Sequence, residues 1–497
     1  MARAPAHPEQ ARVASSTVPT TGSGEGTFAL PRALPLGKIA IPGTLSLRGR
    51  LTGLIALGSL IAGALLLVAF SSAGPSALVS RSLDVFPSWE AGPWHALFNG
   101  ISTNNLTVTR YGFSFLVVAM MLAYLVVLVA ARALSLRSIV ICIVALHAIL
   151  LLGPAVQSND LFTYLGYSRL GGLHGFNPYS HVIAQEMYDP VYAFSGWRHL
   201  SSPYGPLFTA ATYLVAWVPL SVAFWSMKIV TALASLGVLW LVYKCARALG
   251  RDPRLALAFV ALNPVYLVWA LGGFHNDFLM LLPSMAAILL VLKGRDRSAG
   301  AVLMLAVAIK FSTLLLLPFL VVAAWPARSR VKSILIGAAL GAIPLIALSI
   351  GLFGVAHPNL QYQTTLLNNF SVPNVVGDVI GAGGGAPWLL HLADVVLVAV
   401  VVLLLRAKGD WISRAGWATF ALILSLAWLM PWYLIWLTPL AALGASDRLR
   451  KVTLGLTVYL VLCFVPITDI VLSQHGLDPM NTKVGQQSQT LQDTLQK

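Results

Sequence analysis

Long apolar runs without a single charged residue constrain this chain more than any other feature of its sequence. A helix needs about 20 residues to cross the hydrocarbon core of a bilayer, and several runs approach or reach that length. Only 10% of the 497 residues are charged, whereas a soluble domain typically carries about 25%. We therefore expect an all-α, polytopic transmembrane helical bundle. The uninterrupted runs are 51–72, 112–131, 138–156, 255–273, 278–292 and 333–354.

The formal net charge of +15 comes largely from short clusters of Lys and Arg between the apolar runs. Short basic loops of this kind mark the cytoplasmic side of a membrane protein. None of them is long or aromatic enough to predict a nucleic-acid groove, so we expect membrane lipids, and no nucleic acid, as partners. The clusters are Arg132 and Arg137; Lys244, Arg247, Arg251 and Arg254; Lys293, Arg295 and Arg297; Arg328, Arg330 and Lys332; Arg406 and Lys408; Arg448, Arg450 and Lys451.

Placing every basic cluster in the cytoplasm predicts a multi-pass plasma-membrane protein with about 13 crossings and a cytoplasmic N-terminus. This scheme leaves residues 157–205 outside and allows one crossing soon after them, which we place at 224–243. Residues 206–222 then become a re-entrant or interfacial helix. Residues 299–325 must form a hairpin of two short helices, with Lys310 at its outer tip.

Composition divides the chain into three parts. Residues 1–50 are polar, rich in Pro, Ser, Thr and Gly, and lack the apolar core of a signal peptide, which predicts a disordered cytoplasmic tail. Residues 51–473 form the transmembrane domain, with extracytoplasmic loops that carry short interfacial helices. Residues 474–497 are expected to be a flexible tail outside the membrane.

Asp160 is the first candidate functional residue. It follows the third predicted span, within the segment SNDLFTYLGYSRLGGLHGFNPY at 158–179. A partly desolvated carboxylate at the membrane surface suits a general base that takes a proton from a sugar hydroxyl. Tyr164, Tyr167 and Asn177 are residue types that hydrogen-bond to sugars or stack on them. Capping of the following helix by Asp160 is an equally good interpretation of the segment.

The turn GGFHNDFLM at 272–280 places three polar side chains between two apolar runs, those of His275, Asn276 and Asp277. Polar groups near lipid are costly and are functional by default. His275 and Asp277 could orient an acceptor, bind a divalent ion or contact a phosphate. The alternative is a simple helix-to-helix turn with an Asn or Asp cap.

Two lysines lie within apolar runs. A lysine at the bilayer centre costs roughly 2.5–3.5 kcal/mol on insertion scales. At the outer tip of a hairpin, Lys310 could pair with the phosphate of a lipid carrier, and snorkelling to the interface is the alternative. For Lys228, snorkelling is the better interpretation.

The motif MPWYLIWLTPL at 430–440 contains a proline that breaks the helix, followed by Trp432 and Tyr433. Aromatic rings stack on the apolar face of a pyranose, but Trp and Tyr also form ordinary interfacial belts. Alone, this motif favours the belt. In the predicted topology, however, all the polar groups that are not cytoplasmic anchors gather on the outer side, which predicts one site at the outer interface.

The motifs also carry a family resemblance. Five segments in a fixed order, over residues 158–443, resemble the actinobacterial polyprenol-phosphate-mannose-dependent α-1,6-mannosyltransferases, which belong to the GT-C class of membrane glycosyltransferases. The segments are SNDLFTYLGYSRLGGLHGFNPY, SPYGPLF at 202–208, GGFHNDFLM, AIKFSTLLLLP at 308–318 and PWYLIWLTPLAAL at 431–443.

The resemblance implies a GT-C-like catalytic domain that transfers mannose with inversion from polyprenyl phosphomannose to a mannan or lipoglycan acceptor on the extracytoplasmic face. It implies that Asp160 is the catalytic base. No cofactor is demanded, because a polyprenyl phosphate is already a competent leaving group, and a divalent metal is compatible with the scheme without being required. The candidate substrate-binding residues are Tyr164, Asn177, Tyr204, His275, Asn276, Asp277, Lys310, Trp432 and Tyr433.

Two other functions fit parts of the sequence. A GT-C transferase that uses another lipid-linked sugar would carry the same motifs, since these report the class better than the substrate. A secondary transporter would place its ionisable residues near the bilayer midplane and is usually built from repeats. Here the polar residues are expected to gather outside, which disfavours the transporter.

Overall fold

The computed structural model describes residues 43–496, except 104, 326, 359–364 and 479. The expected disordered tail at 1–50 therefore lies almost wholly outside the described residues. The described part of the chain is all-helical, with no β-strand among its elements. This confirms the predicted fold class at the level of an α-helical membrane bundle.

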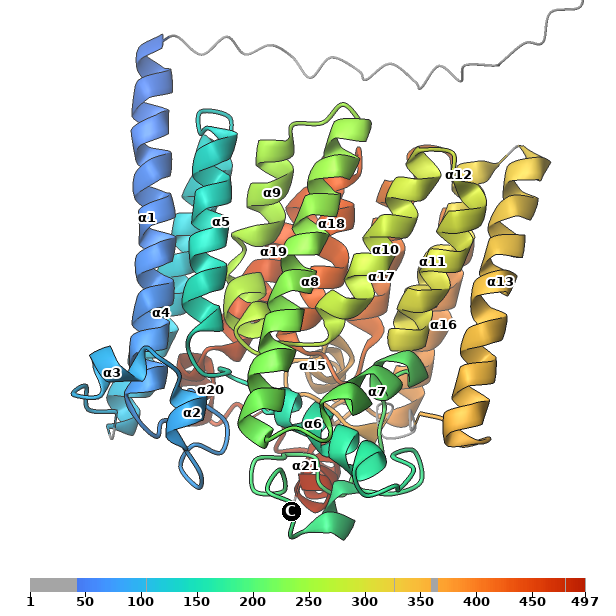
Figure 1. Ribbon diagram of the computed structural model, residues 1–497. Coiled ribbons are helices and arrows are strands. Elements are labelled where there is room, and N and C mark those ends of the chain that lie inside the picture. The colour runs from blue at the N-terminus through green and yellow to red at the C-terminus, as the bar shows by residue number, and fades with distance from the viewer. Residues whose placement is uncertain (1–42, 104, 326, 359–364, 479, 497) are drawn as a thin grey trace, which may run out of the picture. The chain divides into compact units, whose positions relative to one another are not determined.

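Among the described residues thirteen helices make up the bundle, and Figure 1 shows them running side by side. Their hydrophobic side chains pack into one large buried core. The helices are α1 (Gly43–Ala73), α4 (Leu106–Ala130), α5 (Leu136–Leu151), α8 (Leu220–Ala248), α9 (Pro253–Ala261), α10 (Asp277–Leu292), α11 (Asp296–Ile309), α12 (Leu317–Ala324), α13 (Arg328–Phe353), α16 (Pro387–Arg406), α17 (Trp411–Ser425), α18 (Leu434–Leu443) and α19 (Asp447–Phe464).

Five of these helices, α1, α4, α8, α13 and α16, are long and apolar enough to cross a membrane alone. The pair formed by α19 and α20 (Pro466–Gln474), which bends by 66°, brings the number to six if it is counted as one span. The others are shorter, as is tolerated where neighbouring helices enclose them. The total of about 13 crossings stays a prediction.

Small residues let some of these helices approach closely. Gly300 of α11 faces the backbone of α13 at Ile334, and Gly337 of α13 faces the backbone of α11 at Arg297, so that a Cβ atom at either glycine would clash. Because lipid gives little hydrophobic drive for helix association, such close van der Waals contact is a main source of attraction. The pair α11–α13 is therefore fixed by shape.

Basic residues tie the loops together at one end of the bundle. Arg254 Nη1 donates to the carbonyl oxygen of Arg132 over 2.9 Å, and Arg330 pairs with Asp296 over 2.7 Å. Both contacts join residues from the predicted cytoplasmic clusters to neighbouring loops or helix ends. Two pairs of neighbouring predicted clusters are thus in contact, and the membrane orientation stays a prediction.

Short helices gather at the opposite end of the bundle, which is the lower end in Figure 1. As predicted, residues 206–222 do not form a full span: α7 and the short η2 (Tyr213–Val215) precede α8, which begins at Leu220. The short helices are α2 (Ser88–Ala91), α3 (His95–Phe98), α6 (Asp160–Gly172), η1 (Ile183–Glu186), α7 (Pro206–Thr212), α15 (Val372–Val379), α20 and α21 (Lys483–Gln496).

The region 299–325 contains two helices, as expected of a hairpin. Helix α11 ends at Ile309, and the chain continues through the 3₁₀ turn η4 (Phe311–Leu316) into α12. Lys310 lies between them with extended backbone, φ −153° and ψ 119°. The extended residue ends the first helix and sets the lysine side chain at the junction.

An ionic cluster stabilises the loop 157–205, which the predicted topology places outside the membrane and which we call the outer loop. Arg169 Nε pairs with Asp189 over 2.8 Å, and His174 Nε2 reaches the same carboxylate over 2.7 Å. Burial alone would raise the pKa of Asp189, but hydrogen bonds from Arg169 and His174 hold it below its ordinary value of 3.8. The charged form of Asp189 thus ties the C-terminal half of α6 to the loop that follows it.

The C-terminal segment differs from the expected flexible tail at 474–497. Residues 483–496 form helix α21, whose Leu495 is buried and whose Ser488 hydroxyl accepts a hydrogen bond from Leu367 N over 2.7 Å. The polar composition of the segment did not predict this helix. Its apolar contact in the described part of the chain comes from Leu491 and Leu495, which lie four residues apart on one face. Tertiary packing thus orders a helix whose composition indicated disorder.

Candidate active site

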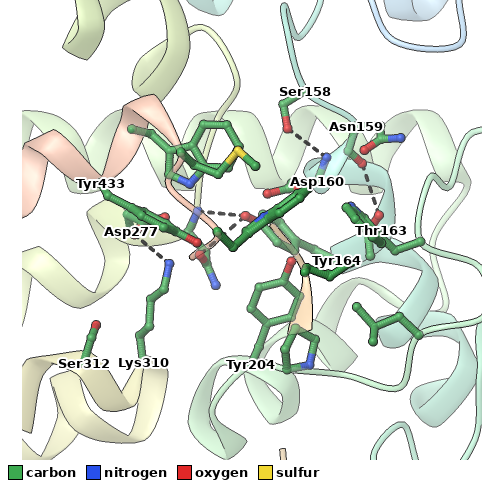
Figure 2. Close-up of a pocket in the computed structure, with 18 of the residues that line it drawn as sticks. Ser158, Asn159, Asp160, Thr163, Tyr164, Tyr204, Asp277, Lys310, Ser312 and Tyr433 are labelled. Atoms are coloured by element: carbon green, nitrogen blue, oxygen red, sulfur yellow. Dashed lines mark hydrogen bonds and ion pairs between the residues drawn. The ribbon is translucent and has the colours of Figure 1, made fainter. Parts of the chain in front are cut away.

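A pocket of about 480 Å³ lies where connecting segments, among them the outer loop, meet the helix ends, and Figure 2 shows part of its lining. This volume is within the range of small-molecule sites. Eight of the ten candidate residues line it, although they come from five separate chain segments. They are Asp160, Tyr164, Tyr204, Asn276, Asp277, Lys310, Trp432 and Tyr433.

Asp160 is the first residue of α6, and its side chain does not cap that helix. The N-cap is Asn159, which makes no side-chain capping hydrogen bond, and Asp160 N is bound by the Ser158 hydroxyl over 3.1 Å. The carboxylate is 16% exposed and lies on the pocket wall. The capping interpretation of this segment is therefore wrong, and the Asp160 carboxylate is available to a ligand.

His275 lies directly behind Asp160. Its Nδ1 is 3.2 Å from Asp160 Oδ2, and its ring stacks on Trp432 with centroids 3.7 Å apart. The imidazole is fully buried and does not line the pocket itself. Neither ring nitrogen has a well-oriented hydrogen bond within the described residues, so His275 can orient or polarise Asp160 but does not reach a ligand.

Lys310 and Asp277 form an ion pair at the pocket, with Nζ and Oδ1 2.8 Å apart (Figure 2). Asp277 is 1% exposed, and its Oδ1 also accepts the indole N–H of Trp436 over 2.6 Å. The ammonium lies over two rings, 5.0 Å from the centroid of Tyr433 and 4.9 Å from that of Trp436. Lys310 is therefore directed at the pocket and not at the lipid interface, which excludes snorkelling.

The turn that carries His275 to Asp277 has an unusual backbone. A π-helical stretch, η3 (Tyr266–Leu271), leads into Gly272 and Gly273, and Phe274 has a φ of +52°. A Cβ atom at either glycine would overlap neighbouring backbone or the His275 ring. π-Helical turns and left-handed residues occur often at functional sites, and here they bring three consecutive polar residues to one pocket.

Tyr164 connects the two main segments of the site. Its hydroxyl lies 3.4 Å from Asn276 Oδ1 and 3.3 Å from Asn276 N, and its ring packs edge-on against Tyr204 at 5.0 Å. Gly205, next to Tyr204, donates its N–H to the Ile309 carbonyl over 3.0 Å. The SPYGPLF segment is thereby joined to the end of α11, beside Lys310.

Lys228 contradicts the snorkelling interpretation. It is fully buried; its Nζ donates to the Gly153 carbonyl oxygen and lies 4.7 Å from the centroid of the Phe274 ring. Glu90, itself 1% exposed, is a nearby counter-charge. These surroundings suit a buried cation, which needs a carbonyl, aromatic faces and an anion around it. Through them, Lys228 contacts both the segment before Asp160 and the turn before His275.

Asn177, like the buried His275, does not line the pocket. Its amide N–H donates to the Phe353 carbonyl over 2.8 Å, and its Oδ1 accepts Tyr179 N over 3.1 Å. Both halves of the amide are therefore used to hold the outer loop. Tyr167, named with it, does line the pocket, although its hydroxyl donates to the Leu200 carbonyl over 2.7 Å.

Several lining residues were missed by sequence reasoning. Trp436 binds Asp277 directly, and its spacing of four residues from Trp432 within PWYLIWL was the available signal. Trp197 and Trp428 lie in loops with no motif around them. Two buried polar atoms of the lining residues have no protein partner among the described residues, and such atoms in a pocket indicate a ligand: Asn276 Nδ2 and Asp277 Oδ2.

Comparison with known proteins gives the class first. Residues 203–464 match glycosyltransferase family 87, and together with the apolar helical bundle this defines a membrane glycosyltransferase. Residues 56–326, more than half of the chain, match the family described as alpha-(1->6)-mannopyranosyltransferase, N-terminal domain. The chain belongs to this family.

Individual relatives are moderately similar. The chain is 28% identical over 355 residues to alpha-(1->6)-mannopyranosyltransferase A of Mycobacterium tuberculosis, covering 64% of this chain and 67% of that protein. It is 27% identical over 375 residues to a probable alpha-(1->6)-mannopyranosyltransferase of Mycolicibacterium smegmatis, covering 62% and 66%. A Corynebacterium glutamicum relative, named alpha-(1->6)-mannopyranosyltransferase A, is 30% identical over 178 residues, covering 35% and 36%. No solved structure matches the chain.

Proposed function

We propose that this protein transfers mannose from polyprenyl phosphomannose to a mannan or lipoglycan acceptor at the extracytoplasmic face of the plasma membrane, with inversion at the anomeric carbon. The observation that carries the proposal is the meeting of a free carboxylate, Asp160, and a directed ammonium, Lys310, in one pocket. The printed names of the relatives, all alpha-(1->6)-mannopyranosyltransferases, support the choice of sugar and linkage.

Asp160 acts as the general base in this scheme. An acceptor hydroxyl attacks the anomeric carbon while its proton passes to the Asp160 carboxylate, and the bond from that carbon to the phosphate oxygen breaks. His275, 3.2 Å behind, holds the carboxylate in place when its Nδ1 carries a proton. Asp277 is less suited to be the base, because one of its oxygens is already bound by Lys310 and Trp436.

Lys310 stabilises the negative charge on the departing polyprenyl phosphate. Its ammonium has three N–H donors, and Asp277 binds one of them, which leaves donors for the phosphate. Pairing with Asp277 fixes the direction of the lysine, so little reorganisation is needed when charge develops on the leaving group. The scheme requires no cofactor, and a divalent metal is not needed to supply the positive charge.

Membranes that contain the full chain, incubated with radiolabelled polyprenyl phosphomannose and an α-1,6-linked mannose oligomer, test the proposal. We expect Asp160→Asn to lower the transfer rate by roughly 100- to 10,000-fold, the usual contribution of a positioned general base. The matched control is Asp84→Asn, whose carboxylate is 69% exposed. Full activity of Asp160→Asn would contradict the assigned base.

The same assay separates mannose from other lipid-linked sugars. We expect transfer from polyprenyl phosphomannose and none from the corresponding glucose-bearing lipid. Equal use of the two lipids would contradict the donor assignment while leaving the class of enzyme intact. The anomeric configuration of the product, read by NMR, tests inversion.

A further inference from the structure

A second part of the pocket lining has a different chemistry from the part around Asp160 and Lys310. Five lining residues, Trp197, Leu200, Leu366, Trp428 and Gln496, carry no charge and come from four separate chain segments. We name this group the tryptophan wall. The rings of Trp197 and Trp428 stand nearly perpendicular, at 83°, with centroids 5.7 Å apart. The wall is therefore a corner of two indoles beside an amide.

Helix α21 holds this wall together. His199 N donates to the Leu495 carbonyl over 3.0 Å, and Leu495 is buried against Leu200 and Leu366. Gln492 Nε2 donates to the Leu367 carbonyl over 3.1 Å. These contacts place the last turn of α21, with Gln496, on the pocket. Neither family match extends past residue 464, so a segment outside both matches completes the pocket.

The chemistry of the wall fits an uncharged sugar. Indole rings present flat apolar surfaces that suit the C–H face of a pyranose, and a carboxamide both donates to and accepts from hydroxyl groups. A phosphate would meet no positive charge among these residues. The phosphate of the lipid donor belongs beside Lys310, so the tryptophan wall is left for the other substrate.

We propose that the tryptophan wall binds sugar residues of the acceptor glycan that do not themselves react, and that α21 is required for this binding. The inference rests on the proposed function and extends it to the acceptor. It makes the preferred acceptor an oligosaccharide: one sugar meets Asp160, and a neighbouring sugar meets the two indoles. A monosaccharide would reach only the reacting position.

The test measures binding without transfer. Purified full-length protein in detergent is titrated with an α-linked mannotetraose, and separately with mannose, in the absence of donor. We expect Trp197→Ala and Gln496→Ala each to weaken tetraose binding by about tenfold, or about 1.4 kcal/mol, with little change for mannose. The matched control is Trp217→Ala, because Trp217 is 72% exposed and does not line this pocket.

A second set of variants keeps the inference falsifiable if an alanine disturbs folding. Trp428→Phe replaces the indole by a smaller aromatic ring, so it disturbs the packing less than alanine would. A chain that ends at residue 482 removes α21 alone. Folding is checked by the thermal transition of each variant. Weaker tetraose binding by folded variants, with unchanged mannose binding, supports the wall. Unchanged tetraose binding by folded Trp197→Ala and by the truncated chain would overturn it.

The inference and the proposed function fail separately. Both the transfer assay and the binding assay are applied to Asp160→Asn and to Trp197→Ala. If Asp160→Asn transferred mannose normally while Trp197→Ala lost tetraose binding, the proposed mechanism would be contradicted and the acceptor role of the tryptophan wall would be supported. If the tetraose bound no better than mannose to the unsubstituted protein, the wall itself would be contradicted.

Discussion

At the scale of single residues, the site depends on which polar groups are already paired and which are free. Lys310 and Asp277 neutralise each other, whereas the Asp160 carboxylate lies 3.2 Å from His275 and stays partly exposed. The two aspartates of the site therefore differ in what they can do. Asp277 orients a cation, and Asp160 can accept a proton. Burial and partners, rather than residue type, separate the two roles.

Substitution of Lys310 tests this division. We expect Lys310→Ala to raise the KM for polyprenyl phosphomannose by roughly 10- to 100-fold, the value of a lost charge-assisted hydrogen bond, and to leave the acceptor KM nearly unchanged. Initial rates over a range of donor concentrations measure this. Lys310→Arg should recover part of the loss, and Arg110→Ala, an exposed cation that does not line the pocket, serves as control. An unchanged donor KM in Lys310→Ala would rule out the phosphate role.

Sequence reasoning identified the residues of the site better than their relations. Asp160, Lys310 and the His275–Asp277 turn were recognisable because polar groups beside long apolar runs are costly. The pairing of Lys310 with Asp277, the burial of Lys228 and the loss of Asn177 to the loop were not predictable, since each depends on contacts between segments far apart in the chain. Spacing along one segment carries no record of such contacts.

At the scale of elements, the short helices do the positioning. The predicted hairpin at 299–325 and the incomplete span at 206–222 follow from one rule, that basic loops share a side. Helix α21 escaped prediction, because its composition is polar and its order comes from contacts with residues more than 100 positions earlier, such as Leu367. The pattern of charges along the chain therefore helps to predict the topology, but it does not predict which segment packs over a pocket.

The outer loop offers a test with a defined pH dependence. Because its partners hold the pKa of Asp189 below 3.8, the stabilisation by this carboxylate is complete above its ordinary pKa and is lost as pH falls through the lower folded value. We expect the loop 173–205 to resist limited proteolysis equally at pH 7 and pH 5. Asp189→Asn should be cut several times faster at both values, because Arg169 loses its buried partner. Equal cutting of the two proteins would contradict this role.

At the scale of the whole molecule, orientation in the membrane is the main prediction to test. The loop between α8 and α9, which carries one predicted cytoplasmic cluster, lies at the upper end of the bundle in Figure 1, whereas α6, which begins at Asp160, lies at the lower end. One label on each side therefore decides the orientation. The three native cysteines are buried, which keeps the background low. We expect a membrane-impermeant maleimide to label Tyr188→Cys on intact cells and Lys293→Cys only after permeabilisation. The reverse pattern would place the site in the cytoplasm.

One backbone hydrogen bond within the fold helps to hold Asp160 and His275 in place relative to each other. Val156 N donates to the Gly272 carbonyl over 2.9 Å, a few residues before Asp160 on one chain segment and before His275 on the other. Lys228 spans the same two segments, so two sets of contacts join the segment of Asp160 to that of the imidazole behind it. Their separation is then set by contacts within the protein and not by the thickness or fluidity of the surrounding lipid.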